Sequence, residues 1–422
     1  MLHRRVKITG IGPVTPAGIG KEAFWRGILE PVSRVRAVPR LVREGTGTFV
    51  AAEVGEFNLS DYFPSFQTRH LPKHTEFALV GAQLALVDAG LRPEDIQGLN
   101  PFVIVGAALM DFGIINHTFD TIAKKGKIIA FPYSVAAASV ASISSMIAEW
   151  VGGSCRTLAV QSACCSGTDA IGHAAEKIAS GEAEFAICGG TDAPIHLHPM
   201  LEMKKAKLSS NSDLMPEKTC RPFDRWRTTG AIGEGAAIFV LEPEESPRPG
   251  YGFIDGYAYA TDPIEEPLSG LEHAMRMALA NARLSPQRIE SINAWGPGHP
   301  MIDAAEARVL RAVFGESLSQ IPAFSIKGAI GNPLGAAGPI QLAATLIGMK
   351  EGILPPTVNW EYPDPACPLC LSGSARYVAH GTALIDAHGL SGTNACLVVR
   401  SQDPAVQEWL PGWAGRGLSR GG

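Results

Sequence analysis

Two adjacent cysteines, Cys164 and Cys165, lie in the segment best suited to covalent chemistry. The apolar residues 157–160 before them predict a buried strand, and the Ala- and Ile-containing residues 168–179 after them predict a helix. Cys164 would then lie on a tight turn beside the unpaired N–H groups and the positive dipole of a helix start, which favour a nucleophilic thiolate. Free cysteines are often small core residues, so this segment alone leaves a nucleophile and a packed thiol equally open.

The segments that would position Cys164 alternate between strands and helices. Apolar runs and periodic segments predict strands at 6–11, 102–106, 158–160, 185–188 and 236–242, and helices at 76–89, 128–150 and 168–179. Alternation of this kind indicates parallel strands with helical connections.

The second part of the chain repeats this alternation of strands and helices after a proline-rich link at 243–250. Strands are expected at 251–260, 291–294 and 323–326, and helices at 271–284, 301–314 and 336–349. The last unit, with a strand at 323–326 and a helix at 336–349, has the same order of strand, turn and helix as the segment that carries Cys164. At 422 residues the chain exceeds one ordinary core. We therefore expect two halves, 1–250 and 251–402, followed by a mobile tail at 403–422.

Composition limits the function classes. The chain is 46% hydrophobic and 18% charged with a formal net charge of -5, so neither disorder nor nucleic-acid binding is expected. The N-terminus shows no signal-peptide pattern, and eight cysteines suit a reducing compartment, which favours the cytoplasm.

Cys367 and Cys370 form a C-x-x-C without a second pair or a nearby His, which favours free thiols over a metal site. Residues 128–148 are uncharged and long enough to span a membrane, but Pro132 and five serines favour a packed interior segment.

The run Ala163-Cys-Cys-Ser-Gly-Thr168 resembles the nucleophile region of β-ketoacyl-acyl carrier protein synthases, in the FabF-like (type II) branch of the thiolase superfamily. Further matches in chain order are Arg4 to Gly12, Ser180 to Glu184, Cys188 to Asp192, Arg221 to Asp224, Gly233 to Ala237, Lys327 to Gly338 and Gly392 to Asn394. The resemblance covers about residues 4–400. It implies an α/β fold, the thiolase-like duplicated αβαβα five-layer sandwich.

The resemblance also implies an acyltransferase activity of the 3-oxoacyl-[acyl-carrier-protein] synthase type. Such an enzyme loads an acyl group from acyl carrier protein onto the cysteine, here Cys164, and condenses it with a malonyl-type thioester in fatty acid or polyketide-like biosynthesis. It uses no cofactor or metal beyond the phosphopantetheine arm of the carrier. It usually forms a homodimer, and a heterodimer with another ketosynthase is the alternative.

Both histidines of the family are replaced here. The first begins a His-Gly-Thr-x-Thr-Pro run, which corresponds to Trp295-Gly-Pro-Gly-His-Pro300. The second ends a Lys-x-x-x-Gly-His run, which corresponds to Lys327-Gly-Ala-Ile-Gly-Asn332. An indole N–H or an amide can donate a hydrogen bond, but neither shuttles a proton as imidazole does. Decarboxylation of a malonyl group, which develops negative charge on a thioester oxygen, is therefore expected to be slow or atypical.

Other expected site residues follow from the same resemblance. Lys327 and Glu306 would form the polar support of the site, while His388 or His299 could replace a missing imidazole within reach of the substrate. On the substrate side we expect Trp295, Leu109 at the floor of the acyl pocket, Leu390 in place of an aromatic gate, and Thr393. Arg227-Thr-Thr-Gly230 also lacks the aromatic residue of the family's Arg-Asp-Gly-Phe loop.

Three functions remain open at this point. The chain could be a ketosynthase with an atypical mechanism, an acyltransferase that no longer decarboxylates, or a non-catalytic subunit that pairs with an active ketosynthase. The presence of Cys164 argues against the third, because a scaffold needs no thiol on this turn.

Overall fold

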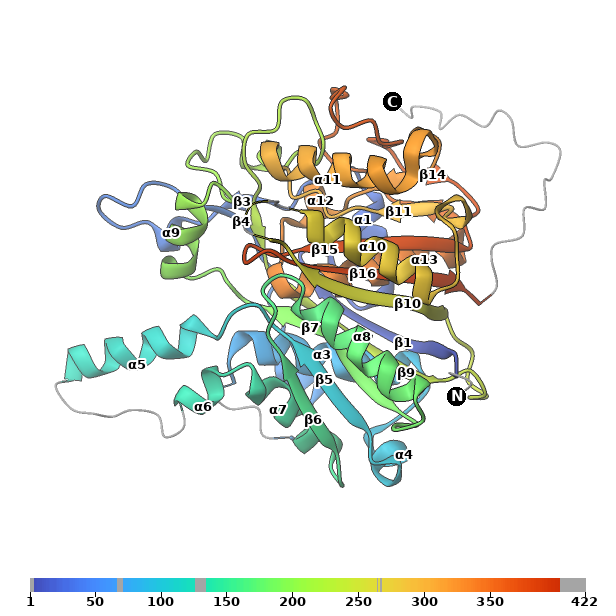
Figure 1. The fold of residues 1–422 in the computed structure, drawn as a ribbon. Helices are drawn as coiled ribbons and strands as arrows, with labels where there is room; N and C mark the ends of the chain where they lie inside the picture. Colours follow the sequence, from blue (N-terminus) through green and yellow to red (C-terminus); the bar gives the residue numbers. More distant parts are fainter. Residues whose placement is uncertain (1–3, 67–70, 126–133, 264, 266–267, 403–422) are drawn as a thin grey trace, which may run out of the picture.

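The computed structural model describes residues 4–66, 71–125, 134–263, 265 and 268–402 (Figure 1). The expected mobile tail at 403–422 and the start of the uncharged segment at 128–148 lie outside the described residues. Among the residues that are described, none of the helices has the length and apolar character needed to cross a bilayer.

The first half of the chain supplies one mixed sheet. Its strands are β1 (Val6–Thr15), β5 (Phe102–Gly106), β6 (Arg156–Val160), β7 (Ala186–Asp192) and β9 (Gly235–Pro243). They lie in the order β6-β5-β7-β9-β1. β5 runs parallel to β6 and β7, whereas β9 runs antiparallel to β7 and β1. β1, β7 and β9 are buried along their whole length, as expected for strands covered on both faces.

The second half repeats this topology strand for strand. Its strands are β10 (Gly252–Thr261), β11 (Ser291–Asn293), β12 (Ala323–Phe324), β15 (Thr382–His388) and β16 (Thr393–Ser401), in the order β12-β11-β15-β16-β10. The parallel and antiparallel pairings also correspond. The two sheets meet where β1 and β10 pair antiparallel, from Val6 opposite Ile254 to Ile8 opposite Gly252. The predicted duplicated α/β fold is confirmed.

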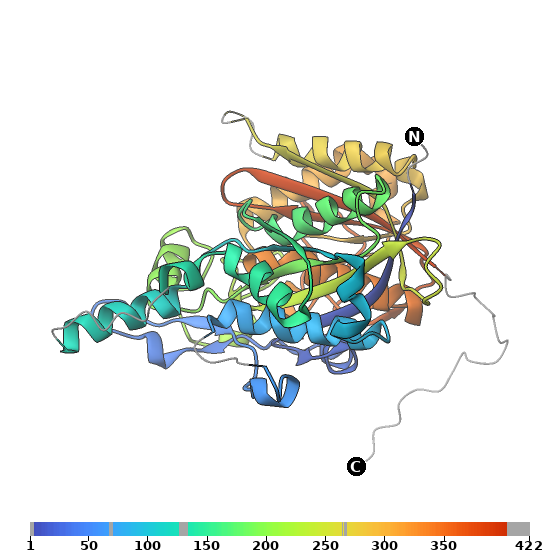
Figure 2. The same cartoon turned by 90° about the horizontal axis from the view of Figure 1, so that it is seen from below.

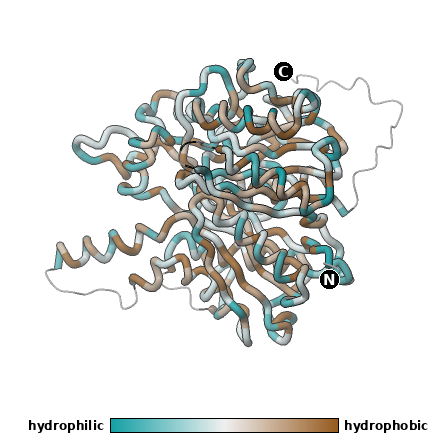
Figure 3. Tube along the Cα trace, in the orientation of Figure 1, coloured by the Kyte–Doolittle hydropathy of each residue, from teal (hydrophilic) through white to brown (hydrophobic). Residues whose placement is uncertain are grey.

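Helices cover and separate the two sheets (Figures 1 and 2). α3 (Lys73–Asp88) and α7 (Ala141–Val151) pack on the outer face of the first sheet, and α10 (Ser269–Asn281) and α11 (Pro300–Phe314) lie on the outer side of the second. α8 (Ser166–Ala179) and α13 (Ala337–Glu351) lie between the sheets. The hydropathy in Figure 3 agrees with this layering, because α13 is apolar on all sides and buried from Ala337 to Met349.

The two central helices approach closely through small residues. A Cβ atom on Gly338 of α13 would lie 1.8 Å from the hydroxyl oxygen of Thr168 on α8, and one on Gly167 would lie 2.4 Å from the carbonyl oxygen of Gly335. Glycine at both positions therefore lets the starts of the two helices meet, which brings the second strand–turn–helix unit next to the Cys164 turn.

The remaining strands and α-helices of the described residues form connections between these elements. The short strands are β2 (Gly18–Ile19), β3 (Arg36–Ala37), β4 (Val50–Ala52), β8 (Ile232–Gly233), β13 (Ile353–Leu354) and β14 (Arg376–Tyr377), and the helices are α1 (Lys21–Leu29), α2 (Leu59–Tyr62), α4 (Pro93–Ile96), α5 (Phe112–Lys125), α6 (Ser134–Ala138), α9 (Leu197–Lys205) and α12 (Lys327–Ile330). α5 extends away from the body (Figures 1 and 2).

The helix expected at 128–150 was predicted incorrectly in its described part, which forms two helices, α6 and α7, rather than one. Ser142 accounts for the break, because its hydroxyl donates to the carbonyl oxygens of Ala137 and Ser139, each at 2.8 Å. Serine side chains that bond to nearby carbonyl groups compete with a continuous helix in this way.

Candidate active site

The Cys164 turn joins β6 to α8 through a strained residue. Ala163 has a φ of 53°, which is uncommon for a residue with a side chain. The turn is closed by hydrogen bonds from Cys165 N to Ser162 O at 3.2 Å and from Ser166 N to Ala163 O at 3.1 Å. The hydroxyl of Thr393 also donates to Ser162 O at 2.9 Å. Strand β16 therefore fixes the turn from the second half of the chain.

Backbone N–H groups face the sulfur of Cys164. They come from Leu390 and from Cys164 itself. The loop that carries Leu390 can lie this close because the preceding residue is Gly389, where a Cβ atom would lie 3.0 Å from the Cβ of Ala163 and 3.3 Å from Cys164 N. Two N–H groups beside a nucleophile can stabilise the oxyanion of a thioester under attack.

The sulfur of Cys164 lies in an apolar cluster. Cys164 is 7% exposed and shares this cluster with Trp295, Leu334 and Ala387, with Leu109 packed against it. Burial raises the pKa of Cys164 to about 12, and the carboxyl of Asp192 acts in the same direction. The N–H of Leu390 and the charge of Lys327 lower the pKa, but by less. This result differs from the expected thiolate, because loss of solvation outweighs the helix start.

Trp295 and Lys327 are stacked in the interior. The Lys327 Nζ lies 3.6 Å from the centroid of the Trp295 ring and donates to Gln341 Oε1 at 3.2 Å. Burial lowers the pKa of Lys327 to about 8, although the carboxyl groups of Glu306 and Asp386 favour its charged form. A cation on an indole face is an attractive contact, so the indole at this position holds the amine in place.

Glu306 supports the turn that carries Trp295. Its two carboxyl oxygens accept hydrogen bonds from Trp295 N at 2.7 Å and Gly296 N at 2.9 Å. Glu306 and Lys327 belong to one buried charged group, as the sequence indicates, while the side-chain hydrogen bond donated by the amine goes to Gln341.

Asn332 follows α12 and is 6% exposed. Its backbone is fixed by Asn332 N bonding to Ala231 O at 2.7 Å and Gly233 N bonding to Asn332 O at 2.9 Å. The side-chain Oδ1 is buried without a hydrogen-bond partner among the described residues. A buried amide with unused capacity is suited to contact a substrate group.

The ring of His388 is directed away from the thiol. Its Nδ1 lies 2.7 Å from Asn394 Oδ1, and Asn394 Nδ2 donates to Asp262 Oδ1 at 2.7 Å, which assigns the proton to His388 Nδ1. Side chains alternate along β15, so His388 faces opposite to Ala387, which packs in the Cys164 cluster. Burial lowers the pKa of His388.

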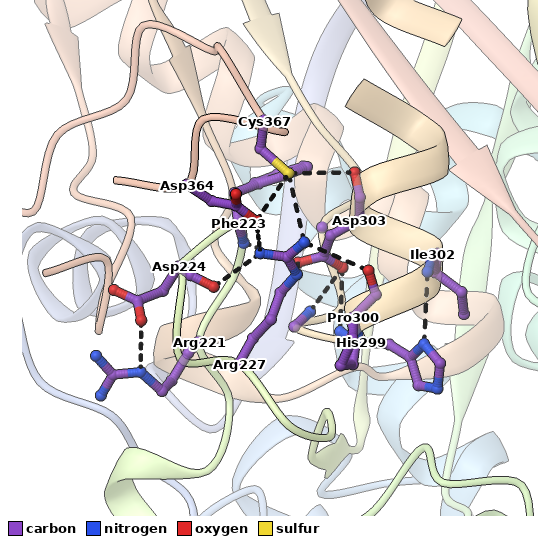
Figure 4. Close-up of polar contacts among 12 residues, drawn as sticks. Arg221, Phe223, Asp224, Arg227, His299, Pro300, Ile302, Asp303, Asp364 and Cys367 are labelled. Atoms are coloured by element: carbon purple, nitrogen blue, oxygen red, sulfur yellow. Dashed lines mark hydrogen bonds and ion pairs between the residues drawn. The ribbon is translucent and has the colours of Figure 1, made fainter. Parts of the chain in front are cut away.

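His299 caps a helix. Its Nδ1 accepts from Met301 N at 3.3 Å and Ile302 N at 3.4 Å, at the start of α11 (Figure 4). Burial lowers the pKa of His299, and the charges of Lys207 and Arg227 act in the same direction. The structure therefore gives this imidazole a neutral, capping role at the start of α11.

A buried arginine holds the same turn in place (Figure 4). Arg227 donates to Asp364 Oδ2 at 2.6 Å, to Asp224 O at 2.8 Å and to Pro300 O at 3.3 Å. Its Nε lies 3.8 Å from Asp303 Oδ2. Asp303 in turn accepts from the N–H groups of Phe223, Gly298 and His299 at 2.7, 3.1 and 3.1 Å. Arg227 thus connects residues 295–300 to the loop at 364–367.

Besides Trp295, three residues were expected on the substrate side, and each has different contacts. The side chain of Leu109 packs against the Cys164 cluster, and its N–H donates to Asp192 Oδ1 at 3.1 Å. Leu390 is 55% exposed and presents its N–H to the sulfur. Thr393 uses its hydroxyl to hold the turn.

Three buried polar residues of this region, Asp192, Gln341 and Asp386, were not predicted from the sequence. Asp192 accepts from the N–H groups of Ala108, Leu109 and Gly335. The available signal was a carboxylate or amide within an otherwise apolar segment, such as Asp386 in residues 382–388. Within the described ranges, no group of three or more His, Cys, Asp or Glu side chains could hold a metal ion.

The duplicated fold and the cysteine at the start of its central helix define a thiolase-type protein. The chain belongs to the β-ketoacyl synthase family, because residues 3–246 match the family model "Beta-ketoacyl synthase, N-terminal domain" and residues 251–361 match "Beta-ketoacyl synthase, C-terminal domain". The resemblance found in the sequence is therefore confirmed.

Relatives of known type agree with this assignment. The chain is 29% identical over 413 residues to 3-oxoacyl-[acyl-carrier-protein] synthase 2 of Coxiella burnetii, covering 94% of this chain and 99% of the relative. It is 32% identical over 387 residues to a putative polyketide beta-ketoacyl synthase 1 of Streptomyces cyaneus, covering 87% of this chain and 91% of the relative.

Solved structures are similar over almost the whole chain. A beta-ketoacyl synthase from Burkholderia phymatum superposes with a TM-score of 0.88 at 27% identity, covering 95% of this chain and all of the other. The ishigamide ketosynthase/chain length factor gives 0.87 at 27% identity with the same coverage. A type II polyketide synthase acyl-carrier protein in complex with its ketosynthase gives 0.85 at 27% identity over 94% of this chain.

Proposed function

We propose that this chain is a β-ketoacyl-acyl carrier protein synthase-like acyltransferase. It accepts an acyl group from acyl carrier protein on Cys164 and condenses it with a malonyl-type thioester, in fatty acid or polyketide-like biosynthesis. The observation that carries the proposal is the Cys164 sulfur on a strained turn with the N–H groups of Leu390 and Cys164 directed at it.

Acyl loading is a thiol–thioester exchange. The sulfur of Cys164 attacks the carbonyl carbon, the oxyanion is held by the two N–H groups, and the carrier sulfur leaves with the proton that Cys164 gives up. No net proton is gained or lost, so this step needs no titrating imidazole. The high pKa of the buried thiol makes the free enzyme slow to react until a thioester is aligned.

Condensation would proceed by an atypical route. The enolate oxygen that forms on decarboxylation needs hydrogen-bond donors, and the buried amide of Asn332 and the indole of Trp295 occupy the places that the family resemblance assigns to histidines. Neither group can exchange a proton with the substrate. Malonyl decarboxylation is therefore slow or restricted to an unusual substrate.

A second candidate is an acyltransferase that does not decarboxylate. The observation that favours it is that both nearby imidazoles are used elsewhere, His388 by Asn394 and His299 by the start of α11. Such an enzyme would pass the acyl group from Cys164 to another thiol, amine or hydroxyl. Carbon dioxide release from a malonyl-carrier thioester separates the two candidates.

Incubation with an acyl-carrier thioester is expected to add one acyl mass to the protein. Intact-protein mass spectrometry measures the gain, which is expected to disappear in Cys164→Ala and to persist in Cys188→Ala, a buried thiol on β7. No mass gain, or a gain that remains in Cys164→Ala, would contradict acyl transfer and favour a non-catalytic partner subunit.

We also propose that two copies associate through β6. This strand lies at one end of the described sheet, and Leu158 on it is 43% exposed. An uncovered edge strand of this kind is a ready pairing site for another chain. A ketosynthase of a different sequence is the alternative partner, as the ketosynthase/chain length factor structure suggests.

Light scattering is expected to give about twice the chain mass of 44.6 kDa for the natural protein and about one chain mass for Leu158→Glu. Val87→Glu introduces the same charge at a 60% exposed position on α3 and is expected to remain dimeric. A natural chain that is monomeric at micromolar concentration would contradict the association of two identical copies and favour pairing with a ketosynthase of a different sequence.

A further inference from the structure

The carboxyl group of Asp169 connects the Cys164 turn to the second half of the chain. The hydroxyl of Ser162, on the turn, donates to Asp169 Oδ2, and the hydroxyl of Tyr257, on β10, donates to Asp169 Oδ1 at 2.9 Å. Asp169 lies in the first turn of α8 and is 5% exposed. The reaction steps described above assign no role to this carboxyl group, and a buried acidic group is costly unless it is well bonded.

Ser162 has a partner for each of its polar groups. Its N–H donates to Ser166 Oγ at 2.9 Å, and its carbonyl oxygen accepts from Cys165 N at 3.2 Å and from the Thr393 hydroxyl at 2.9 Å. Its own hydroxyl is used by Asp169. Of these four bonds, only the one to Asp169 goes to an acidic group, and a bond to an ionised acceptor is stronger than a neutral one.

The ring of Tyr257 lies on α8 because residue 172 is a glycine. A Cβ atom on Gly172 would lie 2.4 Å from each of three carbon atoms of that ring, so any side chain there would displace it. Tyr257 is 7% exposed and follows an irregularity between Ile254 and Gly256 in the pairing of β10 with β16. Irregularities of this kind re-aim side chains. The helix and the strand are therefore both shaped so that the Tyr257 hydroxyl reaches Asp169.

The turn needs this support because Ala163 is strained, with a φ of 53°. A residue in a sparsely populated conformation persists only when its surroundings fix it. Ser162, directly before it, is fixed by groups of α8 and β16 and, through Asp169, by β10. Cys164 directly follows Ala163, so the place of its sulfur relative to the N–H of Leu390 depends on these contacts.

Helix capping does not account for the contacts of Asp169. An acidic residue in the first turn can stabilise a helix through the dipole, and a capping carboxyl accepts from backbone N–H groups. Among the described residues, the side-chain hydrogen bonds of Asp169 instead go to two hydroxyl groups outside the helix. Burial raises the pKa of Asp169, whereas the hydrogen bonds from Ser162 and Tyr257 and the charge of His173 favour its ionised form.

We propose that Asp169 is a positioning residue for acyl transfer, which fixes Ser162 through its carboxyl group and is itself fixed by Tyr257. The clamp formed by these three side chains aligns the Cys164 sulfur with the N–H groups that stabilise the oxyanion. The inference rests on the proposed acylation of Cys164. It assigns part of the alignment to a strand from the other half of the chain.

The clamp affects two reactions of Cys164 differently. Acyl transfer passes through an oxyanion, which is stabilised only when the sulfur and the two N–H groups have one fixed geometry. Alkylation by iodoacetamide displaces iodide from carbon and forms no oxyanion, so it depends on the fraction of thiolate and on access. A misplaced but intact thiol therefore loses acylation and keeps alkylation.

The first test is Asp169→Asn, which keeps the size of the side chain. At saturating acyl-carrier thioester, acylation is expected to slow about 10- to 100-fold, because misplacement by about 1 Å can cost this much. The thioester concentration at half-saturation and the alkylation rate are expected to stay within about threefold of the natural chain. Peptide mapping by mass spectrometry measures both modifications at Cys164. Tyr259→Phe, at a 61% exposed tyrosine of the same strand, is the control and is expected to change neither.

Two further variants disturb the clamp at its outer end. Tyr257→Phe removes only a hydroxyl and Gly172→Ala displaces the ring, so each is expected to slow acylation about three- to tenfold. Because Tyr257 acts through Asp169, adding Tyr257→Phe to Asp169→Asn is expected to slow acylation no further. On the turn itself, Ser162→Ala is expected to match Asp169→Asn, whereas Ser162→Thr keeps the hydroxyl and most of the activity.

Hydrogen exchange tests the clamp without any acyl transfer. The N–H groups of Cys165 and Ser166 close the turn. Peptides that cover residues 157–170 are expected to exchange faster in Asp169→Asn and Tyr257→Phe than in the natural chain, while exchange in α13 is unchanged.

Acylation within about twofold of the natural rate in Asp169→Asn would overturn the proposal. So would a parallel loss of acylation and alkylation, or additive effects of Asp169→Asn and Tyr257→Phe. A natural chain that is never acylated would refute the proposed function. Hydrogen exchange at residues 157–170 then still decides whether the clamp fixes the turn, and unchanged exchange in both variants would overturn it.

Discussion

The double variant Trp295→His, Asn332→His is expected to release carbon dioxide from a malonyl-carrier thioester about 100- to 10,000-fold faster than the natural chain. The resemblance to β-ketoacyl synthases assigns histidines to these two positions. An imidazole donates to the developing enolate oxygen and can exchange a proton, whereas an indole and an amide can donate but cannot exchange a proton. Carbon dioxide release measures the decarboxylation step directly.

The control for this variant is Trp295→Phe, Asn332→Ala, which also opens the packed region but introduces no imidazole. Acylation of Cys164 in both variants reports whether the site has kept its shape. Equal carbon dioxide release from the two variants, with acylation intact, would show that the missing imidazoles do not limit decarboxylation in this protein.

Replacement of Arg227 by methionine is expected to lower the free energy of unfolding by about 3–5 kcal/mol, because it leaves buried carboxylates without their cation. The side chain of Arg227 is 6% exposed and bonds to Asp364, while Asp303 beside it is fully buried. Urea unfolding followed by circular dichroism measures the loss.

The loss from Arg227→Met is expected to depend on pH. Burial raises the pKa of Asp303 to about 7, above its value in the unfolded chain, so folding favours the protonated form of this carboxyl. Stability from this group is therefore present at low pH and is lost as pH rises toward the folded pKa. The variant should be more destabilised at about pH 8 than at about pH 5.

Arg311→Met provides the comparison on the surface. Its ion pair with Glu316 is exposed on both sides, and such pairs contribute about 0–1 kcal/mol. A similar loss for Arg227→Met and Arg311→Met would contradict the supporting role of the buried arginine.

Much of the fold could be predicted from the sequence because its strands are continuous apolar runs and its two halves repeat the same alternation of strands and helices. The Cys164 turn was located on a strand and a helix that the structure contains as β6 and α8. Helix α9, in contrast, was not predicted, since its sequence Leu197-His-Pro-Met-Leu-Glu-Met-Lys-Lys205 is short and only weakly periodic.

The electrostatics of the site could not be predicted in the same way. The dipole argument for a Cys164 thiolate depends on local sequence, whereas the burial that raises its pKa comes from residues such as Trp295 and Ala387, far away in the chain. The same holds for His388, whose direction is set by pairing with Asn394 across β15 and β16.

The central position of β1 has a consequence for synthesis on the ribosome. β1 ends at Thr15, but apart from the two-residue strand β2 its neighbours in the sheet are β9, which begins at Gly235, and β10, which begins at Gly252. At translation rates of about 5–20 residues per second, roughly 10 to 45 s pass before the first of these neighbours is made. During that interval a strand that is fully buried in the folded protein has only the two-residue strand β2 as a partner, so the nascent chain is expected to engage a chaperone before its sheet can close.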